Sequence, residues 1–258
     1  MAQTQSGTTS ADNAAVRLTV VVPVYFEQEL IGETLDALHH DLKTPFKALV
    51  VYDVDEDPTA GVVRDGAARW PHASLVKNNV KRGVLGALRT GFDAAKTEYV
   101  AVFMADLSDD PRILDVMVSK ADEGYDVVSA SRYMSGGHKE GGPWFKSVLS
   151  RGAGQSLHLL TGVPTHDATN AFRLYKTDFV RSIEIESDGG FEVTMELTVK
   201  AYLEGRPVAE VPATWHDRTA GVSKFNFRKW LPKYLRWYFY CLVRSPFGLQ
   251  VTRRTPGR

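Results

Sequence analysis

Apolar runs and helical stripes of apolar residues alternate along the first half of the chain. Residues 18–23 read LTVVVP, a run without polar alternation that is typical of a strand buried on both faces of a parallel sheet. Residues 29–42 place apolar side chains at helical spacing, and residues 48–52 return to a short apolar strand. This order predicts an α/β fold with a mainly parallel central sheet flanked by helices.

The same patterns continue toward the end of the chain. They predict further strands at residues 75–77, 99–105, 126–131, 172–175 and 208–211, and helices at residues 60–70, 84–95, 111–123, 144–160, 192–204 and 227–243. A Gly-rich segment at residues 135–143 breaks the alternation, and residues 215–224 are predicted to form a polar loop.

Composition predicts one compact domain. The chain has 258 residues, 43% of them hydrophobic and 24% charged, which is enough to bury one sizeable core. The start of the chain is polar and lacks the basic and apolar regions of a secretory signal. We therefore expect a disordered tail at residues 1–16, the domain at residues 17–225, and a basic aromatic helix with a tail at residues 226–258.

Charge and cysteine content exclude several kinds of protein. Lys and Arg together number 31, as do Asp and Glu, so no net field would draw nucleic acid to the chain. Cys241 is the only cysteine, which excludes an internal disulfide and a zinc site built from cysteines. No stretch reaches the ~18 consecutive apolar residues of a membrane span, so we expect a soluble or peripherally attached protein.

Polar residues follow three of the predicted strands, at residues 23–27, 52–57 and 106–110. In open parallel sheets, ligands bind beyond the carboxyl ends of the strands. One carboxylate there can bind the base or ribose of a nucleotide, and another can hold a divalent cation that neutralises a diphosphate. Each cluster taken alone is also typical of a solvated loop or a helix N-cap.

Six segments in a fixed order carry a family resemblance: PVYFEQE, YDVDEDPTAG, KRGVLGALRTGF, VAVFMADLSDDP, DVVSASRY and DATNAFRLYK. Together they resemble the inverting glycosyltransferase family 2 with its GT-A nucleotide-sugar-binding fold. Within that family, the likeness is to polyprenyl-phosphate glycosyltransferases of the dolichyl-phosphate mannose synthase type, over residues 17–225. It implies transfer of a sugar from a UDP- or GDP-sugar to dolichyl or undecaprenyl phosphate.

The resemblance implies a nucleotide site at the ends of the first, second and fourth strands. Its residues are Pro23, Tyr25, Glu27, Tyr52, Asp53 and Ala105. Phe26 stands where the family usually has Asn, and Tyr52 stands where it usually has the first of two Asp residues. Because that Asp normally contacts the base, the identity of the base stays open.

The resemblance also implies a divalent cation, Mg²⁺ or Mn²⁺. The family usually reads D-A-D-L-Q where this chain reads MADLS. Asp106 takes the role of catalytic metal ligand and Ser108 supplies a weaker oxygen, with Asp109 or Asp110 able to restore charge. Met104 replaces one carboxylate, so a weakly held metal and a dispensable metal both stay open.

Positive charge is needed for the phosphates of donor and acceptor. The resemblance implies Arg132, Lys146, Arg151, Arg218, Ser223 and Lys224, the last three in a late loop expected to close over phosphates. Arg132 also counts among the expected catalytic residues. A single Lys or Arg is otherwise typical of a solvated surface.

Asp167 matches the acidic residue of the family's D-x-T-S-G-F-R motif and is the candidate for the acceptor side. A hydroxyl acceptor would need it as general base, whereas a phosphate oxygen is already ionised and needs only positioning. A structural role, capping local backbone or pairing with Arg173, is the alternative.

The segment FRKWLPKYLRWYFYCLVR mixes basic and aromatic residues, as an interfacial membrane helix does. A helix that packs its aromatics on the core or on a second subunit fits the same pattern. Together with a lipid acceptor, an interfacial membrane helix predicts a protein of the cytoplasm that attaches peripherally to the cytoplasmic face of a membrane.

Two other functions stay open. A family 2 transferase acting on a saccharide or other hydroxyl would depend on Asp167 as base. A catalytically silent relative would bind nucleotide without turnover, as the loss of carboxylates at Tyr52 and Met104 allows.

Overall fold

A computed structural model of the chain describes residues 15–217 and 227–245. Its sheet strands are β1 (Leu18–Val24), β2 (Phe46–Tyr52), β3 (Ala73–Lys77), β4 (Tyr99–Val102), β5 (Val127–Ser131), β7 (Arg173–Lys176) and β8 (Val208–Pro212), and a separate ribbon joins β6 (His138–Glu140) to β9 (Thr214–His216). The helices are α1 (Ile31–Asp41), α2 (Pro58–Asp65), α3 (Val84–Ala94), α4 (Arg112–Asp122), α5 (Trp144–Thr161), α6 (Thr177–Ser182), α7 (Glu192–Leu203) and α8 (Phe227–Arg244).

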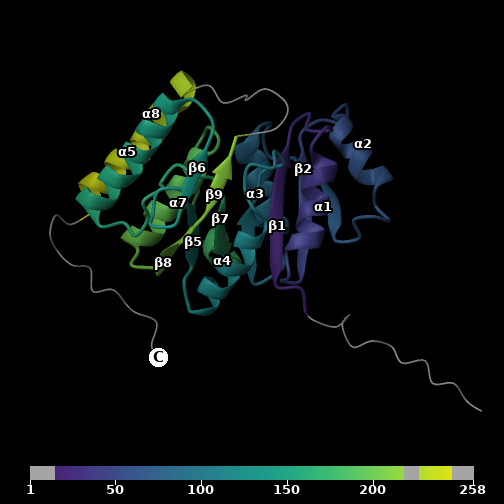
Figure 1. The fold of residues 1–258 in the computed structure, drawn as a ribbon, viewed down its shortest axis with the longest axis horizontal. Helices are drawn as coiled ribbons and strands as arrows, with labels where there is room; N and C mark the ends of the chain where they lie inside the picture. Colours follow the sequence, from purple (N-terminus) through teal and green to yellow (C-terminus); the bar gives the residue numbers. More distant parts are fainter. Residues whose placement is uncertain (1–14, 218–226, 246–258) are drawn as a thin grey trace, which may run out of the picture.

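The central sheet has the strand order β3-β2-β1-β4-β7-β5-β8 (Figure 1). All neighbouring pairs are parallel except those of β7, which runs antiparallel to both β4 and β5. The predicted α/β fold with a mainly parallel sheet is therefore confirmed.

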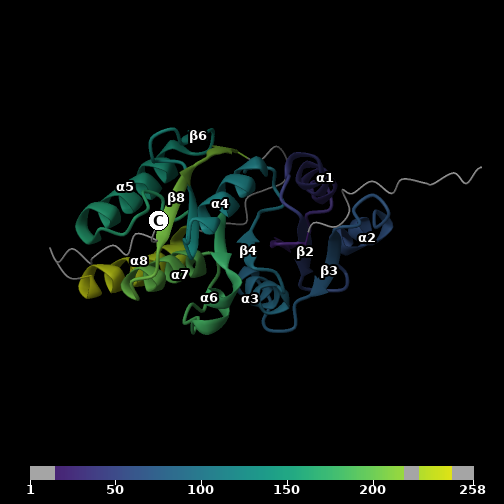
Figure 2. The same cartoon turned by 90° about the horizontal axis from the view of Figure 1, so that it is seen from below.

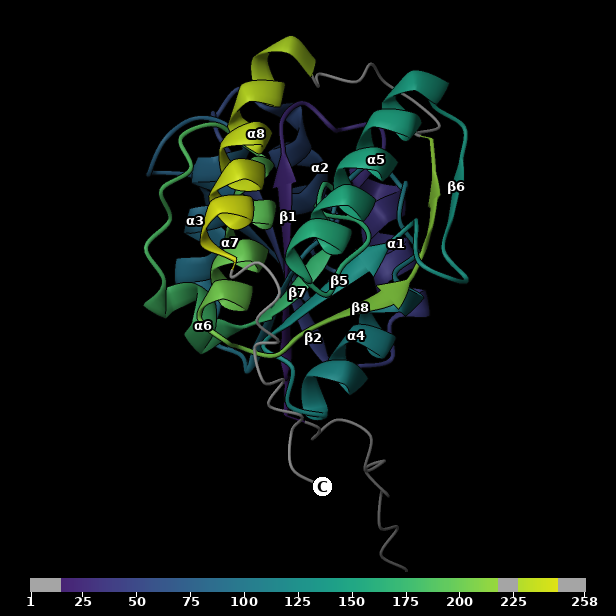
Figure 3. The same ribbon diagram turned by 90° about the vertical axis from the view of Figure 1, so that its left-hand side faces the viewer.

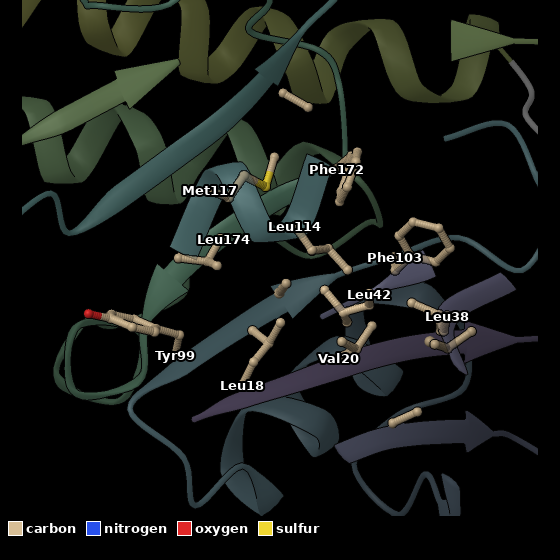
Figure 4. Packing of buried hydrophobic residues seen from close by; sticks show 14 of the residues in the cluster. Leu18, Val20, Leu38, Leu42, Tyr99, Phe103, Leu114, Met117, Phe172 and Leu174 are labelled. Carbon is tan, nitrogen blue, oxygen red and sulfur yellow. The ribbon is translucent and has the colours of Figure 1, made fainter. Parts of the chain in front are cut away.

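Helices cover both faces of this sheet, as Figure 2 shows. Leu18, Val20 and Val22 of β1 pack with α1 and α4 on one face, in the cluster drawn in Figure 4, whereas Val21 packs with α3 on the other. Because successive strand side chains point to opposite faces, both sets must be apolar. This explains why the sequence of β1 shows no polar alternation.

A third cluster lies away from the sheet, between α5, α7 and α8. Leu157, Met195, Trp237 and Cys241 are buried in it. Figures 1 and 2 place α5 and α8 at the end of the molecule opposite α2, and Figure 3 looks onto this end. The C-terminal helix thus packs its buried face on the rest of the protein.

Each strand and helix that the sequence predicts has a counterpart, but some bounds differ. The helix expected over residues 60–70 ends at Asp65, because Gly66 follows and the Trp70 ring packs over it while its indole N–H donates to Asp36 (2.8 Å). The strand expected over residues 99–105 ends at Val102, where pairing with β7 also ends.

Three short elements were not predicted. These are α6, and the strands β6 and β9, which lie in the segments expected to be a Gly-rich break and a polar loop. Strands β6 and β9 pair with each other across more than seventy residues of sequence, so no local pattern marks them.

Candidate active site

The three polar strand ends meet at one edge of the sheet. Strands β1, β2 and β4 are parallel neighbours, and Val24 at the end of β1 pairs with Tyr52 at the end of β2. The loop with Asp106 begins just beyond the end of β4. The sheet therefore brings together the residues that the sequence assigns to the nucleotide and to the metal.

The loop after β1 is fixed by Asp57. The backbone N–H of Phe26 donates to this carboxylate (2.8 Å), and that of Glu27 donates to the Thr59 hydroxyl (2.8 Å). The other Asp57 oxygen caps α2 by accepting from the Thr59 N–H (2.9 Å). Asp57 is buried. It therefore holds in place the loop that the sequence assigns to the nucleotide, a role that the acidic run in the sequence does not reveal.

Phe26 adopts a φ of 56°, in the left-handed region. Asn tolerates this conformation better than most residues, because its short polar side chain costs less there. The Asn that the family usually has at this position therefore fits the backbone that Phe26 also takes.

Asp53 holds the loop before α3. Its two oxygens accept from the Asn78 amide (2.6 Å) and from the Gly83 N–H (2.7 Å). Gly83 has a φ of 105°, which favours glycine. Asp53 thus fixes the loop before α3, beside the strand ends that the sequence assigns to the nucleotide.

Asp106 begins a tight turn. One of its oxygens accepts from the backbone N–H (3.2 Å) and the hydroxyl (2.6 Å) of Ser108, and Leu107 between them has a φ of 56°. Asp110 instead accepts from the backbone N–H of Arg112 (2.9 Å) at the start of α4 and pairs with its guanidinium. Asp110 therefore serves the helix rather than adding charge beside Asp106.

Asp109 is the second carboxylate near Asp106. It is buried, and one of its oxygens has no hydrogen-bond partner. Burial, followed by the neighbouring charge of Asp106, raises the pKa of Asp109 to about 7. Within the described residues, no three acidic, His or Cys side chains gather as a complete metal site. Mg²⁺ commonly takes one or two carboxylates and completes its shell with substrate phosphates, so Asp106, Ser108 and Asp109 fit a cation shared with a diphosphate.

Arg132 and Asp167 form a buried ion pair at the other side of the site. The guanidinium donates to both carboxylate oxygens (2.6 and 2.9 Å), and the Arg132 backbone N–H adds a third bond (3.1 Å). The Asp167 side chain is 0% exposed and that of Arg132 is 11% exposed. Burial pushes the pKa of Asp167 upward, but the charge and hydrogen bonds of Arg132 outweigh it and hold the pKa below its usual range.

Arg173 does not pair with the Asp167 carboxylate. Its guanidinium donates to the Asp167 backbone oxygen (2.9 Å) and to the Thr194 backbone oxygen (2.5 Å). Arg173 therefore supports the loop that carries Asp167.

Comparison with known proteins decides the family. The family model described as Glycosyl transferase family 2 matches residues 19–183. The chain belongs to glycosyltransferase family 2. It is accordingly a glycosyltransferase, as the six sequence segments predicted.

The sequences of two curated relatives align with most of this glycosyltransferase. It is 31% identical to the polyprenol monophosphomannose synthase of Mycolicibacterium smegmatis, over 88% of the chain and 90% of the relative. It is 26% identical to the dolichol-phosphate mannosyltransferase of Pyrococcus furiosus, over 89% of the chain and 64% of the relative.

The solved structures confirm the fold. Glucosyl-3-phosphoglycerate synthase from Mycobacterium tuberculosis, in complex with Mn²⁺, UDP and its product, superposes with a TM-score of 0.66 at 16% identity, over 95% of this chain and 87% of that chain. The same synthase has also been solved with Mg²⁺ and UDP. That synthase thus binds a divalent cation together with UDP.

Not every residue assigned from the sequence of this glycosyltransferase can be placed. Lys146 lies in the first turn of α5, half-buried, and Arg151 lies further along α5, exposed. Arg218, Ser223 and Lys224 fall outside the described residues. Their roles, like those of the other site residues, stay predictions.

Sequence reasoning missed two residues beside Arg132. Lys139 on β6 lies near the charges of Arg132 and Lys146. Tyr234 on α8 is near the charges of Glu192, Arg173 and Arg132, and burial, ahead of Glu192, raises the pKa of its hydroxyl. No motif marks either residue, because both come from segments that the fold brings in from a distance.

Proposed function

We propose that this glycosyltransferase moves a sugar from a UDP- or GDP-sugar to a polyprenyl phosphate, with inversion at the anomeric carbon. The observation that carries the proposal is the burial of Asp167. A hydroxyl acceptor needs a base that reaches it, but this carboxylate is 0% exposed and paired with Arg132. A phosphate oxygen is already ionised, so a positioning role for Asp167 suffices. The names of the two curated relatives support the same acceptor class.

The proposed reaction is a direct displacement. An oxygen of the acceptor phosphate attacks the anomeric carbon, the bond to the donor diphosphate breaks, and the nucleoside diphosphate leaves with the electron pair. Tyr25, Glu27 and Asp53 bind the nucleoside. A divalent cation held by Asp106 and the diphosphate would neutralise the charge of the leaving group.

Arg132 has two roles in this proposal. Its guanidinium orients Asp167 and the turn around it, and the positive charge close to the phosphates favours their approach. Lys146 of α5 and the late-loop residues Arg218 and Lys224 supply the remaining charge for phosphates.

The proposal includes peripheral contact with the cytoplasmic face of a membrane, and exposed apolar residues at one end support it. On α8 they recur every fourth position, at Leu231, Leu235, Phe239 and Val243. The opposite side of α8 carries the fully buried Trp237 and Cys241. The helix therefore has two apolar faces: one packs on the protein, and the other is exposed and can contact lipid.

Helix α5 lies beside α8 and also carries exposed apolar side chains. Its exposed apolar side chains are Trp144, Phe145, Val148, Leu149, Leu159 and Leu160, of which Leu159 is 83% exposed. Several exposed apolar side chains on two neighbouring helices are typical of an interaction site. None of the helices in the described ranges is long and apolar enough to cross a bilayer.

A donor panel tests the proposal. Labelled UDP- and GDP-sugars are incubated with the full-length protein and undecaprenyl or dolichyl phosphate, with Mg²⁺, Mn²⁺ or a chelator. We expect organic-extractable label from one donor, reduced by the chelator. Donor turnover that yields only water-soluble product would refute a lipid acceptor, and nucleotide binding without any turnover would point to a silent relative.

A further inference from the structure

Lys139 reaches the site through the ribbon of β6 and β9. Lys139 pairs with Trp215 in this ribbon, and Trp215 pairs on its other side with Asp109 of the acidic loop. The His216 backbone N–H also donates to the Ser108 backbone oxygen (2.9 Å). Figure 3 shows β6 leading up to the start of α5, with β9 beside it. The ribbon therefore connects the acidic loop to the first turn of α5.

The ammonium group of Lys139 is held in a fixed position. Its Nζ donates to the Ser147 hydroxyl (2.6 Å) and lies 5.0 Å from the centroid of the Trp215 ring. In the part of the chain that the structure describes, Lys139 forms no ion pair with a carboxylate, and its side chain is half-buried. A Lys that only adds solubility would keep its ammonium in water.

The charges around Lys139 leave it poorly compensated. Burial, then the positive charge of Arg132, lowers the pKa of Lys139, and Lys146 acts in the same direction. Asp217 and Asp167 oppose this shift without cancelling it, since Asp217 is exposed and Asp167 is already paired with Arg132. A half-buried ammonium group that forms no ion pair with a carboxylate is unfavourable unless an anion binds beside it.

The position of Lys139 points to the acceptor rather than the donor. It follows β5, which lies two strands beyond β4 in the sheet, whereas the expected nucleotide edge is formed by β1, β2 and β4. Lys146, its cationic neighbour, lies on α5, which carries part of the exposed apolar surface. An isoprenyl chain lying on that surface would bring its phosphate toward these two lysines.

We propose that Lys139, together with Lys146, binds the phosphate group of the acceptor. This inference rests on the proposed function and adds a residue to the acceptor site. A phosphate monoester carries close to two negative charges at neutral pH, which two ammonium groups match. Ser147 and Trp215 orient the Lys139 ammonium for that contact.

The test separates acceptor binding from donor binding. Initial rates of the full-length protein are measured with a short isoprenyl monophosphate such as citronellyl phosphate, varying acceptor and nucleotide-sugar in turn. A hydrogen bond to a charged group contributes about 1.5–3 kcal/mol, so Lys139→Met and Lys139→Gln should raise the acceptor KM at least about tenfold. The donor KM should stay within about twofold, and Lys139→Arg should recover most of the acceptor affinity.

Lys120→Met is the matched control. Lys120 also lies over an aromatic ring, 5.9 Å from the Tyr125 centroid, but it pairs with Glu123. It lies in the last turn of α4, whereas the acidic loop precedes the first turn of that helix. This variant should leave both KM values unchanged.

The outcomes distinguish the two proposals. If the wild-type protein makes no isoprenyl-linked product, the proposed function fails. If it makes product and both Lys139 variants keep the wild-type acceptor KM, the assignment of Lys139 fails while the function stands. A rise in the donor KM instead would place Lys139 at the donor diphosphate and also overturn the assignment.

Discussion

The proposed donor side and the proposed acceptor side of the site are held in shape by different means. On the donor side, Phe26 and Leu107 both have a φ of 56°. Their loops are fixed by two carboxylates: Asp57 accepts from the backbone N–H of Phe26, and Asp106 accepts from that of Ser108. On the acceptor side, shape rests on the buried pair of Arg132 and Asp167. Strained backbone and hydrogen bonds between carboxylates and backbone N–H groups shape one side, and a buried pair of opposite charges shapes the other.

This difference predicts unequal tolerance to substitution. Backbone strain of the kind found at Phe26 and Leu107 is common at functional sites and costs of the order of 1–3 kcal/mol per residue. A buried ion pair contributes little net stability while intact, but loss of one partner leaves the other charge buried and uncompensated. The acceptor side should therefore be the more fragile of the two.

The largest effect is expected from Arg132→Met. It leaves the fully buried Asp167 carboxylate without its partner, so the free energy of unfolding should fall by about 3–5 kcal/mol, measured by chemical denaturation. The double variant Arg132→Met with Asp167→Asn is the control and should recover part of the loss. If the single variant is as stable as the wild type, the ion pair does not hold the acceptor side in shape.

The pair of Arg132 and Asp167 should make the free energy of unfolding depend on pH. The pKa of Asp167 is depressed in the folded protein, so its contribution is fully present above the unfolded carboxyl pKa of about 3.9 and is lost as pH falls through the folded value. Below about pH 4, the wild type should lose more stability than the double variant. Parallel stability curves for the two proteins in this range would contradict the predicted pKa shift.

Asp106→Asn should have the next largest effect, on turnover rather than on folding. Removal of one well-placed electrostatic group commonly costs about 3 kcal/mol in the transition state, so kcat should fall by roughly 100-fold or more. Asp110→Asn is the matched control, because Asp110 binds Arg112 at the start of α4. Unchanged turnover in Asp106→Asn would remove Asp106 from the mechanism.

Val148→Glu on α5 should weaken membrane attachment about tenfold, because it replaces an exposed apolar side chain with a charge. Co-sedimentation with vesicles that contain polyprenyl phosphate measures the effect. Val116→Glu on α4, a similarly exposed valine outside the α5 and α8 surface, should not change binding. Equal loss in both variants would mean that the α5 and α8 surface is not the membrane contact.

The smallest effect is expected from Phe26→Asn. Asn tolerates the left-handed conformation of this residue, so the free energy of unfolding should rise by about 1 kcal/mol. Phe26→Leu keeps the steric cost and should give no gain. A loss of stability in the Asn variant would show that the Phe26 ring, which lies edge-on to Tyr25, contributes more than the strain costs.

The sequence predicted the donor side better than the acceptor side, for a physical reason. Asp53 and Asp106 lie one and four residues after the ends of β2 and β4, so predicting the strands also places these side chains at the sheet edge. Strand-by-strand periodicity was enough to predict the parallel sheet itself.

The contacts on the proposed acceptor side could not be predicted from strand positions in this way. Lys139 reaches the site only because β6 pairs with β9, whose residues come more than seventy positions later. The Arg132 and Asp167 side chains form their ion pair across 35 positions of sequence, and neither of the two motifs that contain them predicts this pairing. Their contact depends on long-range packing, which hydrophobic periodicity does not encode.

Our central proposal is that the acceptor is a phosphate and needs no protein base. The most direct test offers the wild-type protein two acceptors that differ only in that group, an isoprenyl monophosphate and the matching isoprenol, with the donor that supports turnover. We expect transfer of the sugar to the isoprenyl monophosphate and none to the isoprenol. Transfer to the alcohol at a comparable rate would contradict it, because a base able to reach the hydroxyl would then have to exist.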